Sequence, residues 1–206
     1  MSETYAKLTG DWPRFRYIIN NLSPRLKIAI RAAARKNAKL LIREIKKGIK
    51  KQAPGGIVFD KLHELTVIEK ARMRGIGFVK SNQALIRHGD LINLLTFEIN
   101  SDGSFGVGYE KNATNSAGKN INMIASVMES GITIAVTDSV RGYFIAKGTP
   151  LKNSTTHLDI PARPFFEPVF NQFKDEIINN YIMAINSVIQ GRPDLGVFLE
   201  GSDSVE

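Results

Sequence analysis

Residues 23–56 read SPRLKIAIRAAARKNAKLLIREIKKGIKKQAPGG, and this stretch predicts the longest helix of the chain. Ser23 followed by Pro24 is typical of a helix start, because serine caps the first turn and proline suits the first helical position. Proline and two glycines at 54–56 predict its end near Lys51. Apolar residues recur near the helical period and predict one buried face: Leu26, Ile30, Ala33, Leu40, Leu41, Ile45 and Ile49.

The same helix carries a basic residue at every fourth position. We call these residues the basic row: Lys27, Arg31, Arg35, Lys39, Arg43, Lys47 and Lys51. Residues four apart are neighbours on a helix, so the six like-charge contacts together oppose the helix by about 1–3 kcal/mol, with local relief from Glu44 alone. The row is either a solvated face or a docking face for an acidic partner, which is DNA or a neighbouring protein. No aromatic residue interrupts it, which disfavours base stacking on single strands.

The composition is that of a globular protein with one packed core. The chain has 206 residues, of which 43% are apolar and 23% are charged. It has no cysteine, which excludes disulfides, thiolate zinc sites and cysteine nucleophiles. Its first ten residues lack a signal-peptide pattern, and no apolar run approaches the ~18 residues of a membrane span. We therefore expect a protein made in the cytoplasm, without a membrane partner.

The positive charge is concentrated near the N-terminus. Residues 1–60 hold 14 of the 28 basic residues and four of the 20 acidic residues, which gives this part a charge of +10. The remainder, with 14 basic and 16 acidic residues, carries −2. An acidic partner is therefore expected at the N-terminal part of the chain.

The middle of the chain predicts shorter elements. Helical spacing of apolar residues predicts a helix over residues 62–74, followed by a glycine-containing loop at 75–77. Residues 91–99 and 105–109 are predicted strands, because the sequence Asn-Ser-Asp-Gly at 100–103 is a strong hairpin signal. Residues 133–137 predict a third strand, and the polar segment 111–122 predicts an exposed, mobile loop.

The last predicted element is a helix that begins after Pro161 and Pro164 and runs to about Gln190. Its apolar face consists of Phe166, Phe170, Phe173, Ile177, Tyr181, Ala184 and Val188. The order of elements favours an α+β fold in which a small antiparallel sheet is flanked by a long N-terminal and a long C-terminal helix. We expect an N-terminal arm over residues 1–22, a single structural domain over residues 23–194, and a tail over residues 195–206.

Residues that carry chemistry form no recognisable constellation. His63, His88 and His157 stand in no metal-ligand spacing. His157 and Asp159 resemble a base and its orienting acid near Ser154, yet no nucleophile elbow surrounds that serine. We expect no enzyme activity, no catalytic residue, no metal and no cofactor. A hydrolase that uses His157 and Asp159 is an alternative that an activity screen would reveal.

Three stretches resemble, in order, the tail-completion or virion-morphogenesis proteins of tailed phages. They read ALIRHGDLINLL at 84–95, IASVMESG at 124–131 and IPARPFFEP at 160–168. The third is the most specific, because it is similar to a proline-alanine-arginine-proline-phenylalanine signature that opens that family's last helix. The resemblance extends from residue 85 to residue 173, less than half of the chain, and departs from the family pattern at His88 and at Asn93-Leu94.

The resemblance implies a structural virion protein without catalytic residues at the head–tail junction, present in the host cytoplasm during assembly. It implies assembly with itself into a ring, a hexamer by the family's example, and contact with neighbouring neck and tail proteins. Packaged DNA is a further candidate partner. A basic DNA-binding protein that contacts phosphates through its N-terminal helix is the alternative function.

Specific residues follow as candidates for these roles. A closed ring needs two different complementary faces on each subunit. Arg163 is a candidate for pairing with Glu129 or with backbone carbonyls, or else it is exposed. The candidate interaction residues are Lys27, Arg31, Arg35, Lys39, Arg43, Lys47, Trp12 and Arg163. The structural motif, in which prolines set an extended lead-in and aromatic rings anchor the last helix to the sheet, is Pro161, Arg163, Pro164, Phe165, Phe166 and Phe170.

Overall fold

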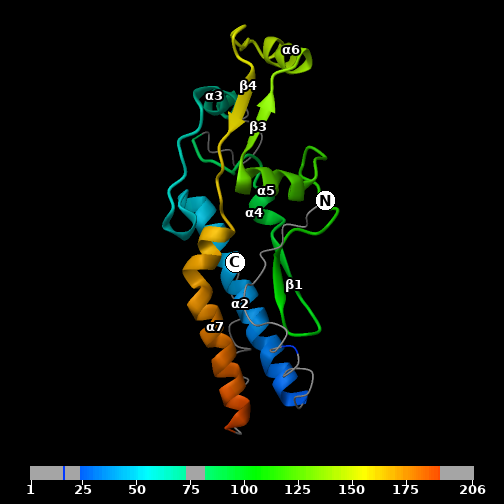
Figure 1. Cartoon of the computed structure of the whole chain (residues 1–206), viewed down its shortest axis with the longest axis vertical. Helices are drawn as coiled ribbons and strands as arrows, with labels where there is room; N and C mark the ends of the chain where they lie inside the picture. Colours follow the sequence, from blue (N-terminus) through cyan, green and yellow to red (C-terminus); the bar gives the residue numbers. More distant parts are fainter. Residues whose placement is uncertain (1–15, 17–23, 73–81, 191–206) are drawn as a thin grey trace.

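The computed structural model describes residues 16, 24–72 and 82–190 and shows an elongated α+β molecule (Figure 1). Two long helices lie side by side along one half, and a β hairpin packs against them. A second hairpin projects from the other end. The predicted fold class is confirmed. The elements are α2 (Pro24–Lys51), η1 (Pro54–Gly56), α3 (Glu64–Arg72), α4 (Asp90–Asn93), β1 (Thr96–Ile99), β2 (Phe105–Gly108), α5 (Ile121–Ser130), β3 (Ile132–Ala135), α6 (Asp138–Ala146), β4 (His157–Ile160) and α7 (Glu167–Ile189).

The antiparallel pair of α2 and α7 forms the main part of the core. All seven apolar residues predicted to face inward from α2 are buried. On α7 the predicted face is buried or packs against the core, as expected. A polar contact lies in the middle of the pair: the Asn37 side chain donates to the Ile177 carbonyl at 3.1 Å and accepts from the Asn180 side chain at 2.7 Å. Both asparagines are buried, so this contact fixes the helices at one relative height.

The first hairpin confirms the predicted turn but corrects one strand. β1 and β2 pair antiparallel around residues 100–103, and Gly103 has a φ of +82°. A Cβ at this glycine would lie 2.4 Å from the Ile30 side chain, so the turn packs directly on α2. Residues 91–95 are not a strand, because the carbonyl of Gly89 accepts from Ile92 and Asn93 and begins the helical turn α4. A short, continuous apolar run does not distinguish these alternatives.

The segment from residue 111 to residue 160 holds elements that the sequence analysis missed. The third strand is confirmed as β3, but its predicted end, Thr137, instead caps α6 by accepting from the N–H of Val140. Helices α5 and α6 and strand β4 were not predicted. The polar segment 111–122 is mostly exposed, as expected, and the side chain of Asn120 caps α5. Its mobility remains a prediction.

Other predictions have mixed outcomes. The helix expected over residues 62–74 is present as α3, and the last helix ends at Ile189, close to the predicted Gln190. The arm with Trp12, the cap residue Ser23, the loop at 75–77 and the tail at 195–206 lie outside the described residues.

The second hairpin, with the helix inserted between its strands, forms what we call the distal arm (residues 132–160). All four residues of β3 are exposed, and α6 buries none of its residues. The strand register places Ile132 and Ile134 on the same face as Ile160 and Leu158, so one face of the ribbon is apolar. The loop after α6 is held by Arg141, whose guanidinium donates to three carbonyls of residues 152–155.

Candidate functional site

Glu129, at the end of α5, anchors the start of α7. Its carboxylate accepts hydrogen bonds from the backbone N–H groups of Phe165 at 2.9 Å, Phe166 at 3.2 Å and Glu167 at 3.0 Å. The first N–H groups of a helix have no partner within the helix and carry the positive end of its dipole, so a carboxylate suits this position. The backbone N–H of Arg163 also donates to the Met128 carbonyl at 2.6 Å. The stretches 124–131 and 160–168 are therefore joined directly.

Aromatic rings extend this anchor to the first hairpin. Phe165 is fully buried, and its ring centroid lies 4.5 Å from that of Phe166. Phe166 meets Tyr109 edge to face, with centroids 6.1 Å apart. The Tyr109 hydroxyl donates to the Leu91 carbonyl at 2.8 Å, and burial together with the negative charge of Glu129 raises the pKa of Tyr109. The ring of Phe166 thus links the start of α7 to Tyr109, the residue that follows β2.

Arg163 differs from its predicted role. The side chain is 8% exposed, so the expectation of an exposed arginine is wrong. The expected pair with Glu129 is not formed, because backbone N–H groups occupy that carboxylate. The guanidinium Nε is buried and has no hydrogen-bond partner among the described residues. Pro161 is exposed and Pro164 is half-buried, as is Phe170.

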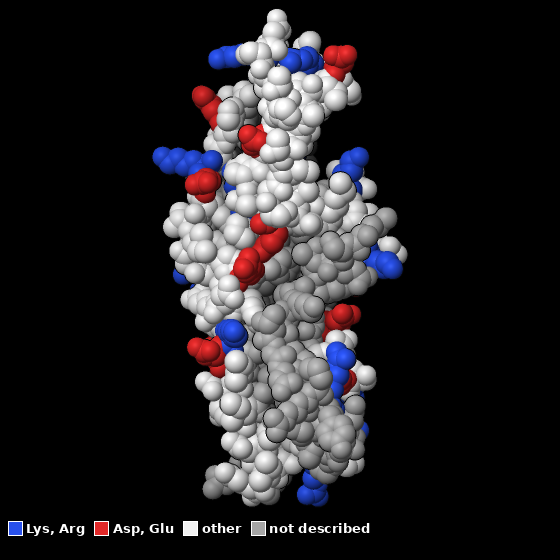
Figure 2. Space-filling model, in the orientation of Figure 1, with Lys and Arg blue, Asp and Glu red and all other residues white. Residues whose placement is uncertain are grey.

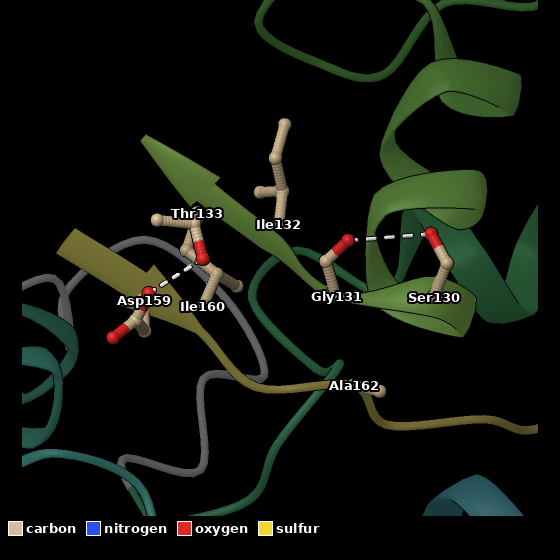
Figure 3. Close-up of a pocket in the computed structure, with 7 residues that line it drawn as sticks. All are labelled: Ser130, Gly131, Ile132, Thr133, Asp159, Ile160 and Ala162. Carbon is tan, nitrogen blue, oxygen red and sulfur yellow. Dashed lines mark hydrogen bonds between the residues drawn. The ribbon is translucent and has the colours of Figure 1, made fainter. Parts of the chain in front are cut away.

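The base of the distal arm holds an open hollow of about 410 Å³ (Figure 3). Gly131 is required there, because a Cβ would lie 2.8 Å from the nitrogen of Ala162. Figure 3 shows Thr133 and Asp159 facing each other across the two strands, where the threonine hydroxyl donates to the carboxylate at 2.6 Å. The residues lining the hollow are Ser130, Gly131, Ile132, Thr133, Asp159, Ile160 and Ala162. They include one charged group, which already has a partner.

The residues of the hydrolase alternative are held by separate contacts. His157 Nδ1 lies 3.0 Å from the Thr156 hydroxyl, whereas Asp159 is bound by Thr133. The imidazole and the carboxylate are thus bound to different threonines and not to each other. The structure therefore does not bring these two residues together as a base and its orienting acid.

The predicted members of the basic row from Lys27 to Lys51 are exposed on α2. Glu44 provides the expected relief, since it accepts from Arg43 at 2.9 Å and from Lys47 at 3.0 Å. Although partial burial alone would raise it, these two hydrogen bonds hold the pKa of Glu44 below its usual value. Arg31, Arg35 and Lys39 make no ion pair with any residue that the structure describes. On the face shown in Figure 2, acidic and basic groups are interspersed along the molecule.

Lys70 is a buried cation that the sequence analysis did not single out. It is 6% exposed, and its Nζ donates to the carbonyl of Gln83. Burial, reinforced by the positive charge of Arg87, lowers the pKa of Lys70 to about 8. Its neighbours on α3 are half-buried or exposed, and lysine is seldom buried in proteins. The sequence alone therefore gave no reason to expect a buried Lys70.

Within the described ranges, no group of three or more His, Asp or Glu residues is arranged to hold a metal ion. In the same residues, no helix combines the length and the apolar character needed to cross a membrane. Comparisons of the chain with protein-family models, with curated proteins and with solved structures find no match.

Proposed function

We propose that this chain is a structural virion protein of the phage neck or tail-completion type, which forms a ring that helps to join head to tail. The observation that carries the proposal is that the three phage-like stretches converge on one site. Leu91, from the first stretch, accepts from Tyr109, whose ring meets Phe166 of the third stretch. Phe166 in turn donates to Glu129 of the second stretch. A resemblance between separated motifs gains weight when the motifs share one structural role.

The surface of the molecule also supports a role in assembly. The distal arm is a two-stranded ribbon with an inserted helix that buries no side chain. Isolated two-stranded hairpins are marginally stable in water, and exposed apolar faces are typical of protein interfaces. An arm of this kind is suited to a protein whose exposed apolar surface is covered by neighbouring subunits in a particle.

The proposal is tested by removing the protein from an assembling particle. In cells that make the phage without this protein, electron microscopy should show DNA-filled heads and tails that are separate or poorly joined. Mass spectrometry of purified wild-type particles should detect the protein. Normally joined infectious particles made without it, or its absence from virions and assembly intermediates, would contradict the proposal.

A second candidate is a DNA-binding protein that contacts phosphates through α2. It is favoured by the exposure of the basic row and by the unpaired guanidinium and ammonium groups of Arg31, Arg35 and Lys39 within the described residues. Phosphate contacts release counterions, so affinity for duplex DNA should fall steeply with salt and be insensitive to sequence. Binding titrations at several salt concentrations separate this candidate from the first.

A further inference from the structure

The two long helices present different outer faces to solvent. On α7, Ile178, Ile182 and Ile189 are 46%, 48% and 73% exposed, and their spacing of four and seven residues places them on one stripe. Asp175, exposed and one turn before Ile178, lies on the same stripe. This stripe, Asp175 to Ile189, is the α7 stripe. It is an apolar strip with an acidic end.

The outer face of α2 has the complementary composition. Ile28 is 57% exposed at the start of the helix, and Arg35 and Lys39 follow it at spacings of seven and four on the same face. This face is an apolar residue followed by cations. Arg35 and Lys39 form no ion pair with a described residue, and neither does Asp175.

The asparagine contact aligns the two faces in height. Asn37 of α2 is level with Ile177 and Asn180 of α7, because it bonds to both residues. The helices are antiparallel and rise about 1.5 Å per residue. Counting outward from this contact, Asp175 is level with the part of α2 near Lys39. By the same count, Ile189 is level with the part near Ile28.

We propose that the outer face of α2 in one copy of the chain packs against the α7 stripe of the next copy at the same height. Lys39 then lies opposite Asp175, Arg35 lies about one turn further along the contact toward Ile182, and Ile28 lies opposite Ile189. Subunits related by a rotation axis parallel to these helices stand at equal heights, so one heterologous contact, repeated, closes a ring. The inference rests on the proposed function only for this side-by-side arrangement of copies.

A second copy of the chain would cover both the outer face of α2 and the α7 stripe, whereas DNA would cover only the face of α2. Duplex DNA would neutralise Arg35 and Lys39 but would leave the three isoleucines of α7 exposed to water. The negatively charged phosphates would also gain nothing from Asp175 and would repel its carboxylate. A second copy covers the apolar stripe and supplies the carboxylate in the same contact. Charge complementarity and matched heights therefore favour the copy as the occupant.

The test uses charge reversal on each face of the full chain. One variant carries Arg35→Glu and Lys39→Glu. The other carries Asp175→Lys together with Glu176→Lys, which reverses the exposed carboxylate next to Asp175 in the chain. Wild type should form a defined oligomer by sedimentation and light scattering. Each variant should associate about tenfold more weakly or worse, a factor equivalent to ~1.4 kcal/mol. Lys152→Glu, which reverses an exposed cation on the distal arm, should associate like wild type.

Restoration distinguishes a direct contact from damage to the fold. A chain that combines all four substitutions, and an equimolar mixture of the two variants, should both recover the wild-type oligomer, because each contact again joins opposite charges. Circular dichroism should show an unchanged fold in every variant. The inference is overturned if wild type stays monomeric, if the Asp175 variant assembles normally, or if the combined chain stays dissociated.

The outcomes also separate this inference from the proposed function. If the protein is found in virions but its self-association does not depend on these charges, the inference is wrong and the proposed function is unaffected. A protein that assembles through this contact but is missing from particles does the reverse. Loss of DNA binding in the α2 variant with unchanged self-association would identify the row as a nucleic-acid surface and overturn the inference.

Discussion

The carboxylate of Glu129 accepts a hydrogen bond from the backbone N–H of Phe166, although 37 residues separate the two along the chain. One side chain thereby holds three consecutive N–H groups at the start of α7, the helix that forms half of the central pair. The angle of this helix is thus set by a distant residue and by the prolines before it.

Glu129→Ala should destabilise the protein by about 1–3 kcal/mol, because the partly buried N–H groups of Phe165 and Phe166 lose a charged acceptor. Glu129→Gln keeps one acceptor oxygen and should lose less. Urea unfolding followed by circular dichroism measures both. Equal stability of wild type and the alanine variant would show that solvent caps α7 equally well.

Phe165→Ala should cost about 3–5 kcal/mol, since the ring is fully buried and its removal leaves a cavity. Phe170 is only half-buried, so Phe170→Ala should lose less. Such losses are a large share of a marginal stability, so assembly should fail before the isolated protein unfolds. Thermal unfolding and electron microscopy of particles measure the two effects. A smaller loss for Phe165→Ala than for Phe170→Ala would contradict the packing described.

Asn37→Ala should destabilise the helix pair by about 1–3 kcal/mol, because the buried amide of Asn180 loses its partner. Replacing both asparagines by leucine removes both polar groups and should cost less than the single change. A double-mutant cycle built from Asn37→Leu, Asn180→Leu and the double leucine variant, measured by denaturant unfolding, gives the coupling energy. If the single and double variants lose stability additively, the two side chains do not depend on each other.

Lys70 predicts a pH dependence with a definite sign. Its pKa is lowered from 10.5 to about 8 in the folded protein, so between these values the unfolded chain binds the proton that the folded protein has released. Stability therefore rises with pH across this window, and the penalty on the buried ammonium is fully present below it. Lys70→Met lacks the effect. The difference in unfolding free energy between wild type and this variant should grow in favour of wild type from about pH 8 upward, and a flat difference would contradict the lowered pKa.

Changing Arg31, Arg35 and Lys39 together to glutamine should preserve the fold, because glutamine is a good helix former and like-charge repulsion is relieved. Particle assembly should nevertheless fall if the basic row is a docking face. Circular dichroism and infectivity measure these two effects. Folded protein that yields normal infectious particles would identify the row as a solvated face.

Local sequence determined the parts of the fold whose forces are local. The period of the apolar residues, with Pro24 at one end and Pro54 beyond the other, is sufficient for α2, and the same reasoning placed α7 within a few residues. The turn at 100–103 followed from its asparagine and glycine, because only a few residues adopt such backbone angles. The aromatic start of α7 could be predicted as an anchor, because large rings before an amphipathic helix bury easily.

Tertiary contacts decided the remainder. Whether residues 91–95 formed a strand or a helical turn depended on Gly89 and on the core around them, and a short apolar run fits both. Glu129 was identified by sequence but assigned to Arg163; its partners are backbone groups, which no side-chain pattern reveals. The relative position of α2 and α7 along their axes is fixed by the contact between Asn37 and Asn180, which lie 143 positions apart in the chain. Sequence alone therefore determined which apolar residues of α2 and α7 face the core, because periodicity is a property of a single helix. The folded chain decided which groups meet, because a contact depends on the placement of two elements.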